Sequence, residues 1–229
     1  MFVSRARGLT VLPDPAGVLA ESRPPHPGRV TQAERRARSR AALLESAARS
    51  LSRYGYGNLV LEQVARDAGY TRGALYHQFD VKQELTLAVL AWILETWDNE
   101  VGALVEREEN AAAALLALAH GHAVFCRRDI ARVAIALRIE FSGQDHPVGR
   151  AVEEAYDVLV TLCVRLIRAG RKAGAIPAGP PATTIGLAFV GAVEGTTIAL
   201  AGRPSHDAQL AVSAAAGVLG VVAPPRRAR

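Results

Sequence analysis

The sequence contains very little cysteine. Cys126 and Cys163 are the only two among 229 residues, and no set of cysteines and histidines has the spacing of a zinc site. A disulfide framework is therefore excluded, and we expect no metal site and no cofactor. Two isolated thiols in apolar surroundings are typical of proteins from a reducing compartment, so we expect a cytoplasmic location.

Aromatic residues are also scarce. They make up 5% of the chain, although hydrophobic residues make up 50%, so helices in this protein must pack mainly through small side chains. Alternation of apolar and polar residues with a period of two is not sustained in any segment. The sequence therefore predicts an all-α fold without a sheet.

Motifs of common catalytic sites are missing as well. The chain has no G-x-S-x-G, no phosphate-binding P-loop and no dinucleotide-binding glycine pattern. His120 and His122 would point about 200° apart on a helix, so they cannot hold one metal ion. Ser142, Asp145 and His146 share one loop that offers no buried base beside a nucleophile. We predict no catalytic residues and a protein that is not an enzyme.

Positive charge is concentrated in the first part of the chain. Residues 1–82 contain 13 Lys and Arg against 7 Asp and Glu, whereas residues 83–223 contain 11 against 15. A basic front end joined to an acidic body indicates that the first part meets a polyanion.

Composition and periodicity divide the chain into four parts. Residues 1–30 have clusters of Pro, Gly and Arg without a helical period, which predicts a disordered basic arm. Residues 31–80 form a first helical domain, residues 81–223 a second, and residues 224–229 a basic tail.

The expected helices follow from apolar periodicity and from breaks at glycine and proline. The first runs from Thr31 to Tyr54, because Leu43, Ala47 and Leu51 recur every four residues. Two short helices follow at 61–68 and 72–79. A long helix at 81–107 would extend roughly 40 Å, enough to link two domains. Further helices are expected at 110–127, 129–142, 147–174, 182–202 and 206–222.

The stretch GYTRGALYHQF at 69–79 combines a turn with an exposed short helix. Gly73 lies inside the predicted helix, where glycine costs about 1 kcal/mol relative to alanine. This cost indicates that something requires a close approach to the backbone. Two short helices joined by a glycine turn, after a helix that can brace them, predict a helix-turn-helix.

In a helix-turn-helix the second short helix enters the major groove of DNA, with its N-terminal residues against bases and phosphates. Gly73 would allow close approach, and Arg72 would reach a guanine edge or a phosphate, unless it pairs with Asp67 or Asp80 instead. The hydroxyl of Thr71, together with Tyr76 and His77, would bind phosphate oxygens and fix the register. The full predicted DNA-binding set is Arg38, Thr71, Arg72, Gly73, Tyr76, His77 and Lys82.

Arg38 belongs to a cluster with Arg35, Arg36 and Arg40 in the first turns of the first helix. Positive charge at a helix N-terminus opposes the helix dipole. The cluster therefore indicates an external partner, although it could also be a solvated face.

The stretch from about 43 to 90 resembles the DNA-binding domain of the tetracycline-repressor (TetR/AcrR) family. The matching residues are Leu43, Leu44, Ala47, Leu51, Gly55, Tyr56, Val64, Ala65, Ala68, Gly69, the run TRGALYHQF at 71–79, Lys82, Glu84 and Leu85. This resemblance implies a ligand-responsive transcriptional regulator, a repressor, that binds a palindromic operator in double-stranded DNA as a homodimer and is released by a small molecule.

Two positions depart from that family pattern. Val60 stands where Ser or Thr commonly begins the first short helix, and it cannot cap the helix through a hydroxyl, unless Asn58 substitutes. Glu62 stands where a basic or polar residue often faces phosphate. Its carboxylate would weaken or rotate that side of the footprint.

The resemblance also implies a cavity among the middle helices for a small apolar or amphipathic effector. Aromatic or polar residues on otherwise apolar stripes are its expected lining, although each could instead belong to the core. Arg138 and Glu140 would either orient a polar ligand group or face water. The predicted lining residues are Trp92, His122, Phe125, Leu137, Phe141, Tyr156, Cys163 and Phe189.

The segments 182–202 and 206–222 are apolar around most of their circumference, and the first carries Glu194 as its only charge. The first is long enough to cross a bilayer, but its Ala, Gly and Thr content favours a helix buried in a protein. We expect both helices to pair with those of a second copy in a four-helix interface, with the closest approach at Gly191, Ala192 and Gly195. The alternatives are a TetR-like binding protein that no longer reads DNA and a membrane-associated helical protein.

Overall fold

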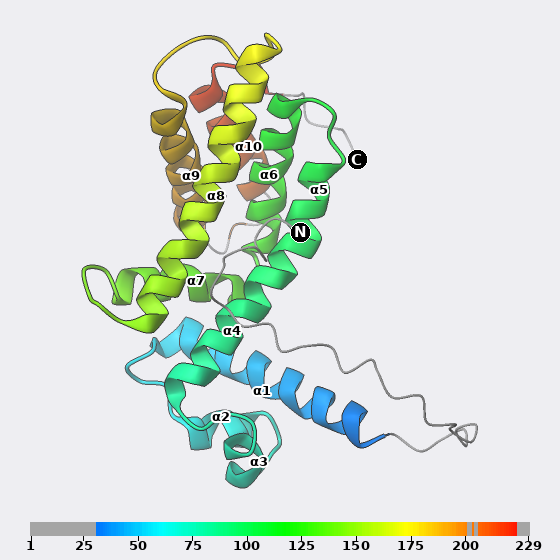
Figure 1. Cartoon of the computed structure of the whole chain (residues 1–229), viewed down its shortest axis with the longest axis vertical. Coiled ribbons are helices and arrows are strands. Elements are labelled where there is room, and N and C mark those ends of the chain that lie inside the picture. Colours follow the sequence, from blue (N-terminus) through cyan, green and yellow to red (C-terminus); the bar gives the residue numbers. More distant parts are fainter. Residues whose placement is uncertain (1–30, 201–202, 204–205, 224–229) are drawn as a thin grey trace, which may run out of the picture.

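The computed structural model describes residues 31–200, 203 and 206–223, and this part of the chain is helical without a strand. The predicted arm at 1–30 and tail at 224–229 lie outside the described residues. The all-α prediction is confirmed. In Figure 1 a small group of helices, α1 to α3, lies at one end of the molecule, and the remaining helices form an elongated bundle above it.

The first helix, α1 (Gln32–Tyr54), starts and stops where its own sequence dictates. Thr31 and Glu34 form a capping box, in which the Thr31 hydroxyl accepts from the Glu34 amide at 3.2 Å. Gly55 ends the helix with φ of 75°, a conformation that favours glycine. The expected stripe of Leu43 and Leu51 is fully buried, so it holds α1 against the rest of the group.

The two short helices are α2 (Leu61–Asp67) and α3 (Arg72–Tyr76). Val60 gives α2 no side-chain cap, and Asn58 does not replace it, because its amide donates to the Tyr54 carbonyl at 3.0 Å and closes α1 instead. Thr71 caps α3 by accepting from the Ala74 amide at 3.2 Å. The turn between the helices passes through Gly69, whose φ is 77°.

The expected long helix at 81–107 contains an interruption. It consists of α4 (Lys82–Trp97), one π-helical turn (Asp98–Gly102) and α5 (Ala103–Glu106). A Cβ on Gly102 would lie 2.7 Å from Oδ1 of the buried Asp98, so glycine makes room for that carboxylate within the wider turn. Single π turns are frequent at functional sites, and this one directly follows Trp97.

The bundle is built from five further helices, and its parts are tied together by a salt bridge at one end. Arg127, after the end of α6, makes two hydrogen bonds of 2.8 and 3.0 Å to Asp207 at the start of α10, and this guanidinium lowers the pKa of the Asp207 carboxyl. The helices are α6 (Ala111–Phe125), α7 (Arg132–Glu140) after a short 3-10 turn (Asp129–Ala131), α8 (Pro147–Lys172), α9 (Ala182–Ala199) and α10 (Asp207–Leu219).

Helix α9 is long and apolar enough to cross a membrane by length and composition, yet only 22% of that window is buried within the chain. Its exposed face carries Leu187, Gly191, Gly195 and Ile198. A Cβ on Gly191 or Gly195 would have no neighbour within 4 Å. The part of the chain that the structure describes therefore leaves this apolar, small-residue face uncovered.

Candidate nucleic-acid interface and internal cavity

Helix α3 is held from one side and exposed on the other. Leu75 is fully buried and Phe79, just after the helix, is 1% exposed, so these two side chains fix the helix to the core. Thr71, Arg72, Gly73 and His77 are exposed and Tyr76 is half-buried. The residues predicted to meet DNA therefore share the outer side of α3.

Arg72 forms an ion pair with Glu62, the residue that departs from the family pattern in the sequence. Its Nε lies 3.2 Å from Glu62 Oε1, and its guanidinium lies 5.2 Å from the centre of the Tyr76 ring. The Tyr76 hydroxyl donates to the same carboxylate at 3.4 Å. The alternative pairing of Arg72 with Asp67 or Asp80 is wrong, since Glu62 is the partner.

The ion pair leaves Arg72 available for an external partner. Its side chain is 68% exposed, and exposed ion pairs contribute only about 0–1 kcal/mol. A phosphate or a guanine edge can therefore compete for the guanidinium. The negative charge of Glu62, expected to repel phosphate, is paired with Arg72.

Gly73 has no reason within the chain to be glycine. Its φ is not in the left-handed region, and an added Cβ would meet only the Thr71 hydroxyl oxygen, at an ordinary 3.9 Å. The folded protein would thus accept a side chain at this position, so the fold itself does not explain the glycine.

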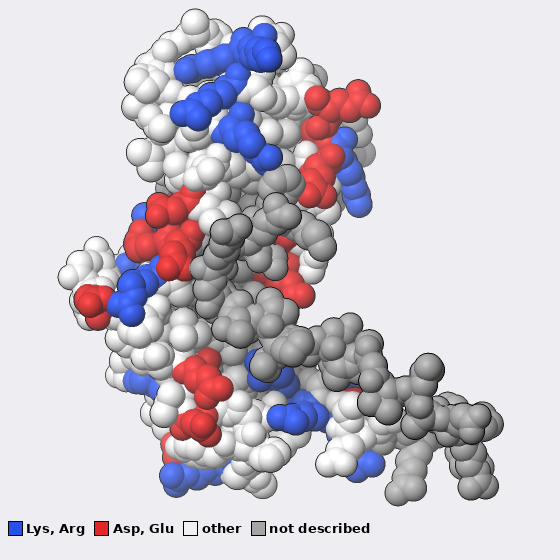
Figure 2. Space-filling view, viewed as in Figure 1, with Lys and Arg blue, Asp and Glu red and all other residues white. Residues whose placement is uncertain are grey.

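The remaining predicted DNA-binding side chains differ in their surroundings. Arg38 is exposed on α1, and a hydrogen bond of 3.0 Å from Gln78 to Ser39 brings the start of α1 beside the end of α3. Figure 2 shows Lys and Arg side chains over α1 and near α2 and α3 at this end of the molecule. The basic cluster and α3 therefore lie next to each other.

Lys82 is engaged within the protein. Its Nζ donates to the carbonyls of Tyr56 at 2.8 Å and Gly57 at 3.2 Å and lies 4.4 Å from the centre of the Tyr56 ring. Two of the three ammonium N–H groups are thus used within the protein, which leaves one for a phosphate.

The turn after α1 is bound from the other side by Glu140, the last residue of α7. One Glu140 carboxylate oxygen accepts from the Tyr56 amide at 2.6 Å and the other from the Gly57 amide at 2.7 Å. A Cβ on Gly55 would lie 2.8 Å from the same carboxylate. Glu140 thus neither orients a ligand nor simply faces water: it joins the bundle to the α1–α2 turn.

Aromatic rings reinforce this junction. The Tyr56 ring meets Phe141 edge-on at 5.1 Å and His146 at 5.2 Å, while Phe141 and His146 stack at 4.3 Å. Phe141, predicted to line the effector cavity, instead packs between the two parts of the molecule.

Three other predicted lining residues also lie outside the cavities described below. Leu137 and Cys163 are fully buried in the core, and Trp92 is half-buried against it. Burial raises the pKa of the Cys163 thiol to about 12, so this cysteine is an inert packing residue.

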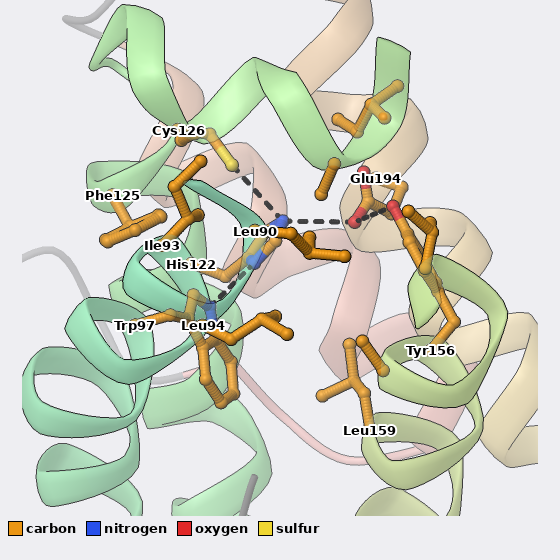
Figure 3. Close-up of a pocket in the computed structure, with 15 residues that line it drawn as sticks. Leu90, Ile93, Leu94, Trp97, His122, Phe125, Cys126, Tyr156, Leu159 and Glu194 are labelled. Atoms are coloured by element: carbon orange, nitrogen blue, oxygen red, sulfur yellow. Dashed lines mark hydrogen bonds and ion pairs between the residues drawn. The ribbon is translucent and has the colours of Figure 1, made fainter. Parts of the chain in front are cut away.

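A cavity with a volume of about 70 Å³ lies between α4, α6, α7, α8 and α9 (Figure 3). His122, Phe125 and Tyr156, three of the predicted residues, line it. Phe189 lines a smaller space that shares His122 and Glu194 with it. The wall is mainly apolar, with Leu90, Ile93, Leu94, Trp97, Cys126, Ala131, Ala134, Ile135, Val152, Ala155, Leu159 and Glu194 completing it.

The polar groups of the wall form one connected cluster. The Trp97 indole donates to His122 Nδ1 at 3.2 Å, and His122 Nε2 lies 3.3 Å from Cys126 Sγ and 3.4 Å from Glu194 Oε1. The Tyr156 hydroxyl donates to the same Glu194 oxygen at 3.2 Å. Burial, followed by the charge of Glu194, raises the pKa of Tyr156, which keeps its hydroxyl a donor.

The protonation of His122 is set by competing surroundings. Burial lowers its pKa, but contacts with Cys126 and Glu194 outweigh burial and raise the pKa to about 10. An indole nitrogen can only donate, however, so the Trp97 contact requires a bare Nδ1. The observed Trp97 contact therefore fits a ring with its hydrogen on Nε2 alone. In the charged ring that Cys126 and Glu194 favour, the N–H groups of Trp97 and His122 would oppose each other.

Sequence reasoning missed three members of this cluster: Trp97, Cys126 and Glu194. The spacing of His122 and Cys126, four residues apart on one helix face, was an available signal. Glu194, as the only charge in an apolar segment, was another. No group of three or more His, Cys, Asp or Glu among the described residues could hold a metal ion.

The exposed helix α3 belongs to a three-helix unit, and this unit is joined to an all-helical body with an internal cavity. These features define a helix-turn-helix protein with a second, helical domain. Residues 43–89 match the family model for bacterial regulatory proteins of the tetR family. This match confirms the resemblance of the helix-turn-helix part of the chain to the TetR family.

Individual relatives agree with this assignment. The chain is 39% identical over 69 residues to the HTH-type transcriptional regulator CymR of Pseudomonas putida, covering 30% of this chain and 34% of CymR. The chain thus spans about a third of the length of the curated relatives it matches.

Solved structures extend the likeness in fold to most of the chain. SCO4454, a TetR-family transcriptional regulator from Streptomyces coelicolor, superposes with a TM-score of 0.69 at 22% identity, covering 80% of this chain and 95% of that one. AibR in complex with isovaleryl coenzyme A and operator DNA superposes with a TM-score of 0.66 at 17% identity, covering 80% of this chain and all of AibR.

Proposed function

We propose that this protein is a ligand-responsive transcriptional regulator, a repressor, that binds a palindromic operator through α3 and leaves it when a small molecule fills the cavity. The observation that carries the proposal is Gly73, which is exposed on α3 and which the fold itself does not need. A bare backbone at the start of the second short helix suits a helix that seats against DNA. Since the target is genomic DNA, we place the protein in the cytoplasm.

A homodimer supplies the symmetry that a palindrome needs. The uncovered face of α9, with Gly191 and Gly195 open to the outside, offers a close helix–helix approach, and α10 packs beside it. A second copy would cover both helices by the same surface on each subunit. The half-sites would then lie about 34–36 Å apart or somewhat more.

Two routes connect the cavity with the turn between α1 and α2. Helix α4 contributes Leu90, Ile93, Leu94 and Trp97 to the cavity wall, and at its start Lys82 binds the α1–α2 turn. Helix α7 contributes wall residues and ends at Glu140, which binds the same turn. A ligand that moves α4 and α7 would therefore shift the helix-turn-helix unit, and it must favour the released state by several kcal/mol to empty the operator.

The DNA-binding role is tested by selecting duplexes from a random pool and measuring binding of variants to the selected sequence. Arg72→Ala is expected to lose discrimination at one base position, by roughly 1–3 kcal/mol, because a bidentate contact to guanine would be missing. Tyr76→Phe is expected to weaken binding to all duplexes alike, since a phosphate contact carries no sequence information. Unchanged binding by both variants would remove α3 from the interface.

Gly191→Leu is expected to split the dimer, because its side chain would hold apart two backbones that approach closely at this position. The side chain has free space within one subunit, so the fold should be retained. Light scattering measures the mass. Gly217→Leu, at another glycine with no neighbour within 4 Å, places the same side chain on α10 and so compares the two helices as parts of the interface. A Gly191→Leu protein that stays dimeric would place the interface elsewhere.

A further inference from the structure

We infer that the cavity selects a compact ligand with an apolar body and one hydrogen-bond donor, an amine or a hydroxyl, which binds the free carboxylate oxygen of Glu194. The inference rests on the proposed function only in calling this ligand the effector. The binding itself follows from the cavity wall.

Glu194 leaves one acceptor unsatisfied in an apolar space. Its Oε1 receives the Tyr156 hydroxyl at 3.2 Å and lies 3.4 Å from His122 Nε2. Its Oε2 is buried and has no hydrogen-bond partner among the described residues. Figure 3 shows this second oxygen turned away from both contacts. A buried acceptor without a partner is costly, so a ligand that donates to it gains the full benefit of that contact.

The other polar groups of the wall do not compete for the ligand. The Trp97 N–H is used by His122 and the Tyr156 O–H by Glu194. His122 Nε2 faces both Cys126 and Glu194. The wall thus offers acceptor capacity at one point and apolar contact elsewhere, which sets the chemistry of the occupant.

This pattern discriminates against anionic ligands. A carboxylate in the cavity would lie beside the carboxylate of Glu194, and like charges in a buried space repel strongly. The guanidinium of Arg138 lies against the Tyr156 ring at 3.9 Å, but it pairs with Glu153, and it does not line the cavity. A ligand of acidic character would therefore find no lysine or arginine in the wall, and His122 already faces Glu194.

The test compares four probes with one body: 4-ethylphenol, 4-ethylbenzylamine, ethylbenzene and 4-ethylbenzoate. Binding to the full-length protein is followed by fluorescence of Trp97, which lines the cavity, in a Trp92→Phe background. The phenol and the amine are expected to bind at least about tenfold more tightly than ethylbenzene, and the benzoate most weakly. The two donor probes distinguish a hydroxyl from an amine ligand.

Glu194→Gln is expected to reverse part of this order, because its amide N–H can donate to the benzoate and the negative charge is gone. Glu154→Gln, on the exposed side of α8, is the matched control and should leave the order unchanged. The inference is overturned if ethylbenzene binds wild-type protein as tightly as the donors, if the benzoate binds best, if no probe binds, or if Glu194→Gln keeps the wild-type order. Because no DNA is present, these outcomes are independent of operator binding.

Discussion

Gly73→Leu is expected to leave the fold intact and to reduce operator affinity by about 10- to 100-fold. Within the protein an added Cβ meets only Thr71, at 3.9 Å, so the side chain points into free space. Against DNA it would keep α3 away from the groove, and inserting methylenes into a packed contact costs roughly 1–3 kcal/mol. Anisotropy of a labelled selected duplex measures the affinity, and thermal unfolding measures the stability.

Gly73→Ala provides the matched control, because it adds only a methyl group. It is expected to leave the free energy of unfolding unchanged or to raise it by up to about 1 kcal/mol, because alanine is the better helix former, while its methyl group weakens DNA binding less than leucine does. If Gly73→Leu bound the operator as tightly as wild-type protein, Gly73 would not lie at the interface.

Glu140→Ala is expected to lower the free energy of unfolding by roughly 2 kcal/mol and to disconnect effector binding from DNA release. The carboxylate accepts two amide hydrogen bonds, of 2.6 and 2.7 Å, from Tyr56 and Gly57, and bonds to charged groups contribute about 1.5–3 kcal/mol each. The expected loss is smaller than the sum of two such bonds, because the site is only partly buried. Urea unfolding measures the first effect.

The second effect is measured as the ratio of operator affinities with and without ligand. In coupled sites this ratio is typically about 5- to 150-fold, and in Glu140→Ala it should fall toward one while the cavity still binds ligand. Glu140→Gln should lie between, because its amide can accept at one oxygen only. Glu154→Ala is the control. A full ligand response in Glu140→Ala would leave α4 as the carrier of the signal.

The sequence predicted most of the local structure because local rules decide it. The stripe of Leu43, Ala47 and Leu51 placed α1 within one residue of its observed start. The GYTRGALYHQF pattern likewise located α3. By contrast, the start of α4 has no side-chain cap: Val81 is the N-cap, and the Asp80 amide donates to Glu84 at 2.9 Å.

The features that connect the two parts of the molecule were not predictable from sequence alone. The contact between Glu140 and Tyr56 joins residues 84 positions apart, and no local pattern specifies such a pairing. The lining of the cavity was equally ambiguous, because an aromatic residue on an apolar stripe fills the core or faces a cavity with the same periodicity. Phe141 and Tyr156 looked alike in sequence, yet they lie at the junction and in the cavity wall.

The most direct measurement is the affinity of the full-length protein for its selected duplex as a function of salt. If α3 and the neighbouring arginines seat against phosphates, binding should weaken steeply between about 50 and 200 mM salt, because phosphate contacts release counterions. Gly73→Leu should lower the affinity at every salt concentration. If the protein bound no duplex even at low ionic strength, or bound with an affinity that salt did not change, α3 would not be a DNA-reading helix.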